Sequence, residues 1–152
     1  MNTTYKCILV PIDLDHESSW QSSLPAAIDL ARRHDAQLTI ITIVPDSDIP
    51  TIANYLPKEI DDHLREEGAN RLNQFIAEYV PQDIRVQSIV GQGRIYSGIL
   101  HIASDLNADL IVMASHNPGL ADYLIGANAE KVMRHAQCSV MVVRNKMESK
   151  TL

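Results

Sequence analysis

The sequence predicts an α/β fold, in which a single domain forms an open, mostly parallel five-stranded sheet with helices on both faces. Its 152 residues fit one domain with one core. Five apolar, strand-like segments alternate with four segments of helical periodicity. The first and fourth strand-like segments, residues 5–13 and 110–113, are uninterrupted apolar runs, which are typical of strands buried on both faces. We therefore expect these two strands to be neighbours at the centre of the sheet.

The segments that follow the first strand predict a helix and a second strand. Apolar side chains recur at helical spacing up to residue 35. Pro25 either kinks this helix or lies near its start at Ser22 or Ser23, because proline is tolerated only in the first turn. Residues 38–44 are rich in Ile, Thr and Val, which favours a strand.

The middle of the chain predicts a loop, a long helix and a less buried strand. Residues 45–57 contain three prolines and no clear period, which is typical of a surface loop or a lid. A helix is expected from residue 57 to 79, although Gly68 weakens it. Residues 84–90 alternate apolar and polar side chains, so we expect a strand with one wetter face or an edge position, ending in a turn at residues 91–93.

The last third of the chain completes the alternation. Residues 95–106 predict a helix that leads into the strand at 110–113. After a loop, Gly126 and its small neighbours are expected to open a helix, and Ser139–Val143 predicts the last strand. That strand is apolar on both faces, and as the end of an open sheet it would be an unprotected edge, so we expect it to be covered.

Composition excludes several classes of partner. There are 13 Lys and Arg residues against 19 Asp and Glu residues, a net charge of −6, which argues against DNA, RNA or an anionic membrane surface. Cys7 and Cys138 each begin an apolar run, which favours buried, reduced core residues over a disulfide. The N-terminus has no apolar signal core, and no run approaches the roughly 18 apolar residues of a membrane span. We therefore expect a soluble protein of the cytoplasm.

The ends of two strands carry the residues that point to a ligand. In a parallel sheet, ligands bind outside the carboxyl ends of the strands, where the strand order reverses. The first strand ends in Pro11, Ile12 and Asp13, and the fourth ends in residues 113–116. A helix that opens with Gly126 leaves unpaired N–H groups open to an anion, which the helix dipole also favours. The sequence therefore predicts a crevice with an anion site at this edge.

Four segments carry a pattern typical of a known family: ILVPID at 8–13, IVMASH at 111–116, YLIGANA at 123–129 and RHAQCSVMVV at 134–143. They resemble the universal stress proteins, and in particular their small, single-domain F/G-type branch. The resemblance implies a universal stress protein domain over residues 1–144, with strand order 3-2-1-4-5. Residues 145–152 are polar, which predicts a flexible tail. The family resemblance also implies a stress-response regulator that binds an adenine nucleotide, usually ATP but also ADP or AMP, with Mg²⁺ as a candidate companion. Members of the family commonly dimerise through the last strand, which here is Ser139–Val143.

The resemblance also implies which residues form the nucleotide site. They are Pro11, Ile12 and Asp13 beside the ribose and adenine, Ile43 beside the adenine, Met113, Ala114 and Asn117 on the ribose and phosphate wall with Ser115 and His116 between them, and Gly126, Ala127, Asn128 and Ala129 at the phosphates. The family pattern is Gly-x-x-Gly-x(9)-Gly-Ser/Thr. Here Ala114 and Asn117 replace the first two glycines, Gly126 comes one residue early, and Ala127 stands where Ser or Thr is commoner.

Several of these residues also have simpler explanations. Asp13 is equally suited to capping the turn after the first strand, His116 to an ordinary polar loop, and Gly126 to tight packing. The other histidines have no metal-ligand spacing among them. Gly91 and Gly93 do not complete a dinucleotide-binding fingerprint, because no third glycine follows at the required distance.

Two other functions compete with nucleotide binding. Asp13-Leu14-Asp15 after an apolar strand is similar to the start of haloacid-dehalogenase-type phosphotransferases, but the later carboxylates that hold magnesium and a Walker-type lysine loop are both absent from the sequence. We therefore expect slow hydrolysis or autophosphorylation at most. The second alternative is a regulator that acts through an unknown client protein without a nucleotide, because Ala127 removes a hydroxyl that would contact phosphate.

Overall fold

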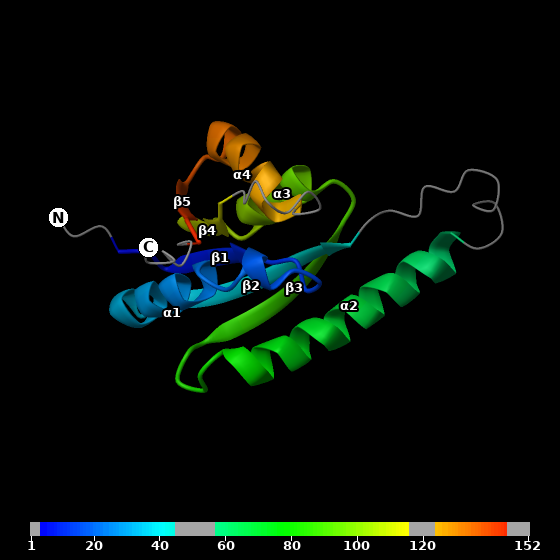
Figure 1. Cartoon of the computed structure of the whole chain (residues 1–152), viewed down its shortest axis with the longest axis horizontal. Coiled ribbons are helices and arrows are strands. Elements are labelled where there is room, and N and C mark those ends of the chain that lie inside the picture. The colour runs from blue at the N-terminus through cyan, green and yellow to red at the C-terminus, as the bar shows by residue number, and fades with distance from the viewer. Residues whose placement is uncertain (1–3, 45–56, 116–123, 146–152) are drawn as a thin grey trace, which may run out of the picture.

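The computed structural model describes residues 4–44, 57–115 and 124–145, which form a five-stranded parallel sheet with helices on both faces (Figure 1). The strands are β1 (Cys7–Pro11), β2 (Gln37–Val44), β3 (Val86–Gln92), β4 (Leu110–Ala114) and β5 (Ser139–Val143). The helices are the short 3-10 helix η1 (Glu17–Ser19), α1 (Ser23–His34), α2 (Pro57–Tyr79), α3 (Ile95–Asp105) and α4 (Leu124–His135). The strand order β3-β2-β1-β4-β5 confirms the predicted topology.

The two most apolar strands lie side by side in the centre of the sheet, as the sequence predicts. β1 pairs in parallel with β4, with Ile8 opposite Leu110, and with β2 on its other side. The side chains of Ile8, Leu9 and Val10 are completely buried. Strand order reverses between β1 and β4, because the chain runs outward from β1 through β2 to β3 and then returns to β4.

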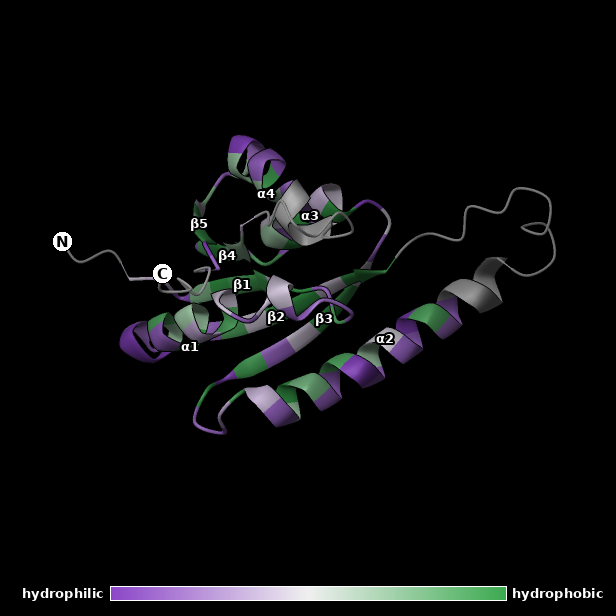
Figure 2. Cartoon of the chain, viewed as in Figure 1, coloured by the Kyte–Doolittle hydropathy of each residue, from purple (hydrophilic) through white to green (hydrophobic). Residues whose placement is uncertain are grey.

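Two apolar layers hold the helices to the sheet. Ile8 and Val10 point to the face covered by α1 and α2, whereas Leu9 points to the face covered by α3 and α4. This alternation follows from the two-residue period of a strand. Figure 2 shows the result: hydrophobic residues dominate the inner strands, while the helices carry both kinds of side chain. Gly68 does not interrupt α2, and a Cβ there would lie 3.3 Å from Val44 Cγ1, so close packing on β2 explains the glycine.

Strand β3 differs from its predicted bounds. It starts two residues later than expected and continues to Gln92, because Gly91 and Gln92 pair with Ile43 and Val44 of β2. The turn is confined to Gly93, which has a φ of 106°. Its position at the edge of the sheet confirms the prediction of a wetter strand.

The amino edge of the sheet is tied together by one aspartate. Asp109 precedes β4, and its Oδ2 accepts hydrogen bonds from the backbone N–H groups of Lys6 (2.7 Å) and Cys7 (2.9 Å). Its own N–H donates to the carbonyl of Cys7. Asp109 therefore fixes the start of β4 against the start of β1.

The ends of the chain add two further observations. Asn145, which the sequence places at the start of a polar tail, donates from Nδ2 to the carbonyl oxygen of Ser18 at 3.0 Å, so the chain is still attached to η1 at this residue. The rest of that tail and the predicted loop over residues 45–56 lie outside the described residues. None of the helices in the described part is long and apolar enough to cross a membrane.

Candidate functional site

The carboxyl end of β1 forms the floor of the candidate site. Pro11 and Ile12 are buried, and the Ile12 N–H donates to the carbonyl of Ile41 at 2.8 Å, which holds the end of β1 against β2. Ile12 packs into the core beneath α1 and α2. These two residues therefore support the edge through the backbone and do not present side chains to solvent.

Asp13 leads the chain away from the sheet and organises the turn that follows. Its Oδ1 accepts from the N–H of Asp15 at 3.0 Å, and its Oδ2 lies 2.9 Å from Nδ1 of His16. The hydroxyl of the buried Ser19 accepts from the Asp13 N–H and donates to the Asp13 carbonyl. The simpler interpretation of Asp13 as a turn residue is therefore confirmed. Each carboxylate oxygen has a second lone pair, so this role leaves room for a ligand contact.

The last residues of β4 are fully buried and do not contact solvent, as residues that line an open ligand site would. Met113 and Ala114 are completely buried, and the next residue, Ser115, is half-buried with its N–H bonded to the Val143 carbonyl. The predicted site residues His116 and Asn117 lie outside the described residues. Met113 and Ala114 thus belong to the layer beneath the edge.

Helix α4 begins earlier than the sequence predicts. Its first residue is Leu124, so Gly126 lies in the first turn, where helix N–H groups lack a partner in the helix. The N–H groups of Asn128 and Ala129 lie past this turn. Ala129 is buried at 4% exposure, whereas Asn128 is half-buried. Ala127 lies within the helix, and its side chain is outside the described part.

A cavity of about 550 Å³ lies at this carboxyl edge, on the face covered by α3 and α4. We call it the carboxyl-edge cavity; it is lined by Ile43, Gly93, Arg94, Ile95, Tyr96, Asn128 and Lys131. It brings together two of the predicted site residues, Ile43 and Asn128. The carboxyl-end rule explains its position, because Ile43 comes from the end of β2 and Gly93 follows the end of β3.

Two glycines make the seat in which Ile43 lies. A Cβ on Gly91 of β3 would lie 2.6 Å from Ile43 Cδ1, and a Cβ on Gly98 of α3 would lie 2.9 Å from the same atom. Both distances are shorter than real carbon contacts, so any larger residue would displace the Ile43 side chain. The absence of side chains at Gly91 and Gly98 therefore sets the wall of the carboxyl-edge cavity.

The charged and aromatic residues of this cavity were not among the predicted site residues. Arg94 and Tyr96 stand at the start of α3, and Lys131 extends from α4 to place its Nζ 5.1 Å from the centre of the Tyr96 ring. One sequence signal was available: the pair Gly93-Arg94 follows a predicted strand and precedes a predicted helix. The rule that ligands bind at the carboxyl ends of parallel strands identifies this pair when it is applied to the third strand as well as to the first and fourth.

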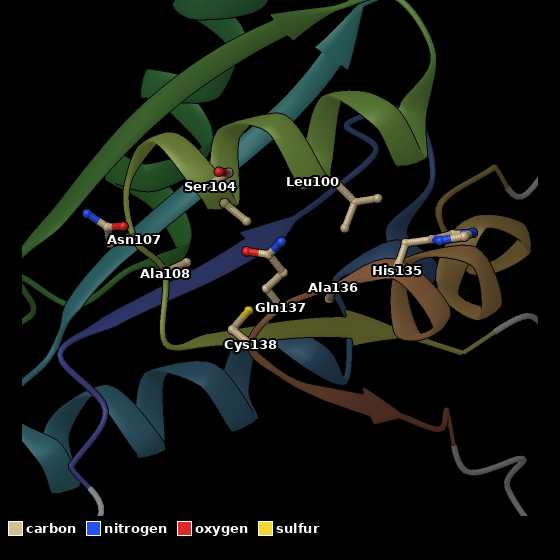
Figure 3. A pocket seen from close by; sticks show the side chains of 9 residues that line it. Leu100, Ser104, Asn107, Ala108, His135, Ala136, Gln137 and Cys138 are labelled. Atoms are coloured by element: carbon tan, nitrogen blue, oxygen red, sulfur yellow. The ribbon is translucent and has the colours of Figure 1, made fainter.

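A second cavity lies at the opposite, amino edge of the sheet, between the ends of α3 and α4 (Figure 3). This amino-edge cavity has a volume of about 330 Å³, and its lining includes Ser104, Asn107, His135, Gln137 and Cys138. Among the described residues, no lysine, arginine or predicted site residue lines it. Its position at the amino ends of the strands is the wrong one for a ligand site of an open parallel sheet.

The two cysteines are free thiols close to that edge. They are half-buried rather than fully buried, because both lie at the ends of strands instead of within them. Burial raises the pKa of both the Cys7 and the Cys138 thiols, and the negative charge of Asp109 adds to the pKa increase of each. Among the described residues, no three His, Cys, Asp or Glu side chains group closely enough to hold a metal ion.

Comparison with known proteins places the chain in a family. The model of the universal stress protein family matches residues 4–144. Universal stress protein G of Shigella flexneri is 28% identical over 142 residues, which cover 92% of this chain and 99% of that protein. Universal stress protein G of Salmonella typhimurium is 27% identical over the same length and coverage.

Solved structures agree with the fold. Universal stress protein UspA from Lactobacillus plantarum superposes with a TM-score of 0.71 at 26% identity, covering 94% of this chain and 100% of that one. A universal stress protein in complex with cAMP superposes with a TM-score of 0.59 at 20% identity, covering 95% of this chain and 100% of that one. The chain therefore belongs to the universal stress protein family, and its relatives called universal stress protein G support the F/G-type branch.

Proposed function

We propose that the protein binds an adenine nucleotide, most readily ATP, at the carboxyl edge of its sheet and acts as a stress-response regulator. The observation that carries this proposal is the carboxyl-edge cavity, which combines the apolar Ile43 with the cationic Arg94 and Lys131. An apolar wall suits a base, and cations suit phosphates. The relative solved with cAMP supports a ligand of this class for the fold.

The proposed site divides into a base side and a phosphate side. Ile43 and the turn at Asp13 would face the adenine and ribose, above the floor made by Pro11, Ile12, Met113 and Ala114. The first turn of α4 at Gly126 would face the phosphates. Mg²⁺ would enter with the nucleotide, held by phosphate oxygens, because the described residues offer no cluster of three metal ligands.

The most direct test of this function is the identity of any nucleotide that purifies with the protein. Mass spectrometry after acid extraction of freshly purified protein should find ATP or ADP. Calorimetric titration of nucleotide-free protein with ATP-Mg should give a binding isotherm that the Gly126→Val variant loses, because a branched side chain blocks close approach to the backbone. Ala77→Val, an exposed position on α2, is the matched control. Unchanged affinity in Gly126→Val would refute the site.

We further propose that ATP turnover is slow. A phosphotransferase of the Asp-nucleophile kind needs a carboxylate aimed at the phosphate, whereas Asp15 and His16 orient the Asp13 carboxylate toward its own turn. The rate of phosphate release at steady state should stay below about one turnover per minute, as expected for a binding protein. Multiple turnovers per minute that disappear in Asp13→Ala would establish the phosphotransferase instead.

The alternative is a regulator of the same fold that acts through a client protein without a nucleotide. The complete burial of Met113 and Ala114, two residues predicted to line the nucleotide site, favours this alternative. It predicts no heat on titration with ATP-Mg and no nucleotide in the acid extract. Either positive result excludes it.

We also propose a homodimer through β5. In the described part of the chain β5 pairs only with β4, and Met141 is 38% exposed. The Val143 carbonyl faces β4, since it accepts from Ser115, so the polar groups of its neighbour Val142 face outward. Val142→Pro should remove an outward donor and convert the dimer to a monomer in light scattering, whereas Val142→Thr should not. An unchanged mass in Val142→Pro would refute this interface.

We place the protein in the cytoplasm on the basis of its cysteines. Cys7 and Cys138 are both free. Free thiols are typical of a reducing compartment. Fractionation of the cells that make the protein should recover it with cytoplasmic markers, and recovery with secreted proteins would contradict this location.

A further inference from the structure

The carboxyl-edge cavity holds two positive charges that no acidic side chain of the described residues neutralises. Arg94 and Lys131 both line it, and no aspartate or glutamate among the described residues does. In the part of the chain that the structure describes, neither side chain forms an ion pair. Other described arginines do have acidic partners, such as Arg32 with Asp83 and Arg71 with Asp15. On a protein with a net charge of −6, this pair is a local positive field.

The start of α3 adds backbone donors to the same field. Arg94 is the N-cap residue of α3, and its side chain does not cap the helix. The first hydrogen bond of the helix runs from the Gly98 N–H to the Arg94 carbonyl at 2.9 Å. The N–H groups of Ile95 and Tyr96, whose residues line the cavity, come before that bond and have no partner in the helix. The positive end of the helix dipole therefore lies beside the two cations.

Lys131 lies over an aromatic ring in the first turn of α3, the helix whose N-cap residue is Arg94. Lys131 of α4 places its Nζ 5.1 Å from the centre of the Tyr96 ring of α3. This cation–π contact holds the ammonium group near the first turn of α3. Helices α3 and α4 lie next to each other on one face of the sheet, and their packing brings Lys131 beside the start of α3 (Figure 1). Both cations therefore line the cavity before a ligand binds.

We propose that Arg94 and Lys131 bind the terminal phosphates of a nucleoside di- or triphosphate and make the site select these ligands over nucleoside monophosphates. This inference rests on the proposed nucleotide site and adds its specificity. A monophosphate is satisfied by the first turn of α4, whereas each further phosphate adds negative charge that needs its own partner. Two cations and a free helix end supply partners for a polyphosphate chain.

The test compares ligands that differ only in the number of phosphates. ATP, ADP and AMP are titrated calorimetrically into the wild-type protein and into Arg94→Gln, Lys131→Gln and the double variant. Each single change should weaken ATP binding about tenfold, since a charge-assisted hydrogen bond is lost, and the double variant about 30-fold or more. AMP affinity should change less than about threefold. Added salt should weaken ATP binding more in the wild type than in the double variant.

A matched variant separates a local effect from a change in overall charge. The double variant Lys6→Gln/Arg33→Gln also removes two positive charges, but from residues that do not line the cavity. It should leave the ATP to AMP preference unchanged, and melting curves should show that every variant is folded. Equal losses of ATP affinity in this control and in the Arg94/Lys131 double variant would overturn the proposal. Equal weakening of ATP and AMP by the double variant would also overturn it.

The outcome also separates this inference from the function on which it rests. If wild-type protein binds ATP, ADP and AMP with the same affinity, the nucleotide site stands and the selectivity is refuted. If it binds no nucleotide, inorganic tripolyphosphate is the remaining probe. Binding of tripolyphosphate that is lost in the double variant would support the cationic site while refuting adenine binding. Absence of both interactions would refute both proposals.

Discussion

A cavity lies at each edge of the sheet, but the two edges differ in whether their charged groups have partners within the protein. At the amino edge, the Asp109 carboxylate is used to join β1 to β4, and the thiols of Cys7 and Cys138 are kept neutral by burial. At the carboxyl edge, Arg94 and Lys131 have no acidic partner among the described residues. The first arrangement stabilises the fold, whereas the second leaves charge available for a ligand.

The two cavities also differ in the chemistry of the residues that line them. The amino-edge cavity is well formed, with Ser104, Asn107 and Gln137 on its wall, but its lining residues do not converge on one kind of ligand. The carboxyl-edge cavity places an apolar side chain, two cations and a helix start around one space. The chemistry of the lining therefore distinguishes the two edges, and variants at each edge should have different effects.

The largest effect on stability is expected at the amino edge. Asp109→Ala should lower the free energy of unfolding by about 2 kcal/mol, because the N–H groups of Lys6 and Cys7 lose a charged acceptor. ATP affinity at 25 °C should stay within about twofold of the wild-type value, because the substitution lies at the opposite edge of the sheet. Urea unfolding and calorimetry measure the two quantities. The control Asp105→Ala, an exposed carboxylate of α3, should change stability by less than about 0.5 kcal/mol.

A smaller loss of stability is expected from Ser19→Ala, this time together with a loss of binding. The Ser19 hydroxyl is completely buried and closes the Asp13 turn through two hydrogen bonds, so its removal should cost about 1–2 kcal/mol. A looser turn should also weaken ATP binding. Ser104→Ala at the amino-edge cavity should leave both quantities within error. Equal effects of the two substitutions on ATP affinity would remove the distinction between the edges.

Gly98→Ala should change the cavity more than it changes stability. The new Cβ would lie 2.9 Å from Ile43 Cδ1, so the Ile43 side chain must move. The gain in helix propensity of about 1 kcal/mol offsets much of this cost. ATP affinity should fall about threefold, a change near 0.6 kcal/mol. Gly68→Ala is the control, because its Cβ would meet Val44 on the other face of the sheet. Equal affinities for ATP in the two variants would show that Ile43 does not contact the ligand.

The smallest effect concerns the thiols. Because burial raises the pKa of Cys7 and Cys138 above the ordinary value of 9.0, both should react with iodoacetamide more slowly in the folded protein than in urea at pH 8. The unfolded thiols lose their protons first as the pH rises. Stability from this source is therefore complete below pH 9.0 and falls as the pH rises toward the folded pKa values. Equal reaction rates in the folded and unfolded protein would contradict the assignment.

The fold was predictable from the sequence because its strongest signals are periodic. The apolar runs of β1 and β4 indicated the centre of the sheet, and the helical spacing before Asp35 indicated α1. The exact bounds of β3 were not predictable, because glycine usually weakens a strand, whereas Gly91 pairs with Ile43 of β2. Pairing with β2 therefore outweighed the local preference of the sequence.

The candidate site was only partly predictable. Ile43 and Asn128 were among the expected residues and do line the carboxyl-edge cavity. Arg94 and Tyr96 were missed because the carboxyl-end rule was applied only to the first and fourth strands, and Lys131 because its contact with Tyr96 depends on how α3 packs against α4. The hydrogen bonds between Ser19 and Asp13 depend on the fold of η1, a short helix that the sequence pattern does not indicate.

The most direct test of ATP binding at the carboxyl edge is a nuclear magnetic resonance titration of nucleotide-free protein with ATP-Mg, because it reports on both edges at once. Binding at this edge should shift the backbone amide signals of Gly93, Ile95, Tyr96 and Lys131. The signals of Ala103, Asn107 and Cys138 should stay unchanged. Shifts confined to the amino-edge residues, or no shifts at all at saturating ATP, would contradict this binding.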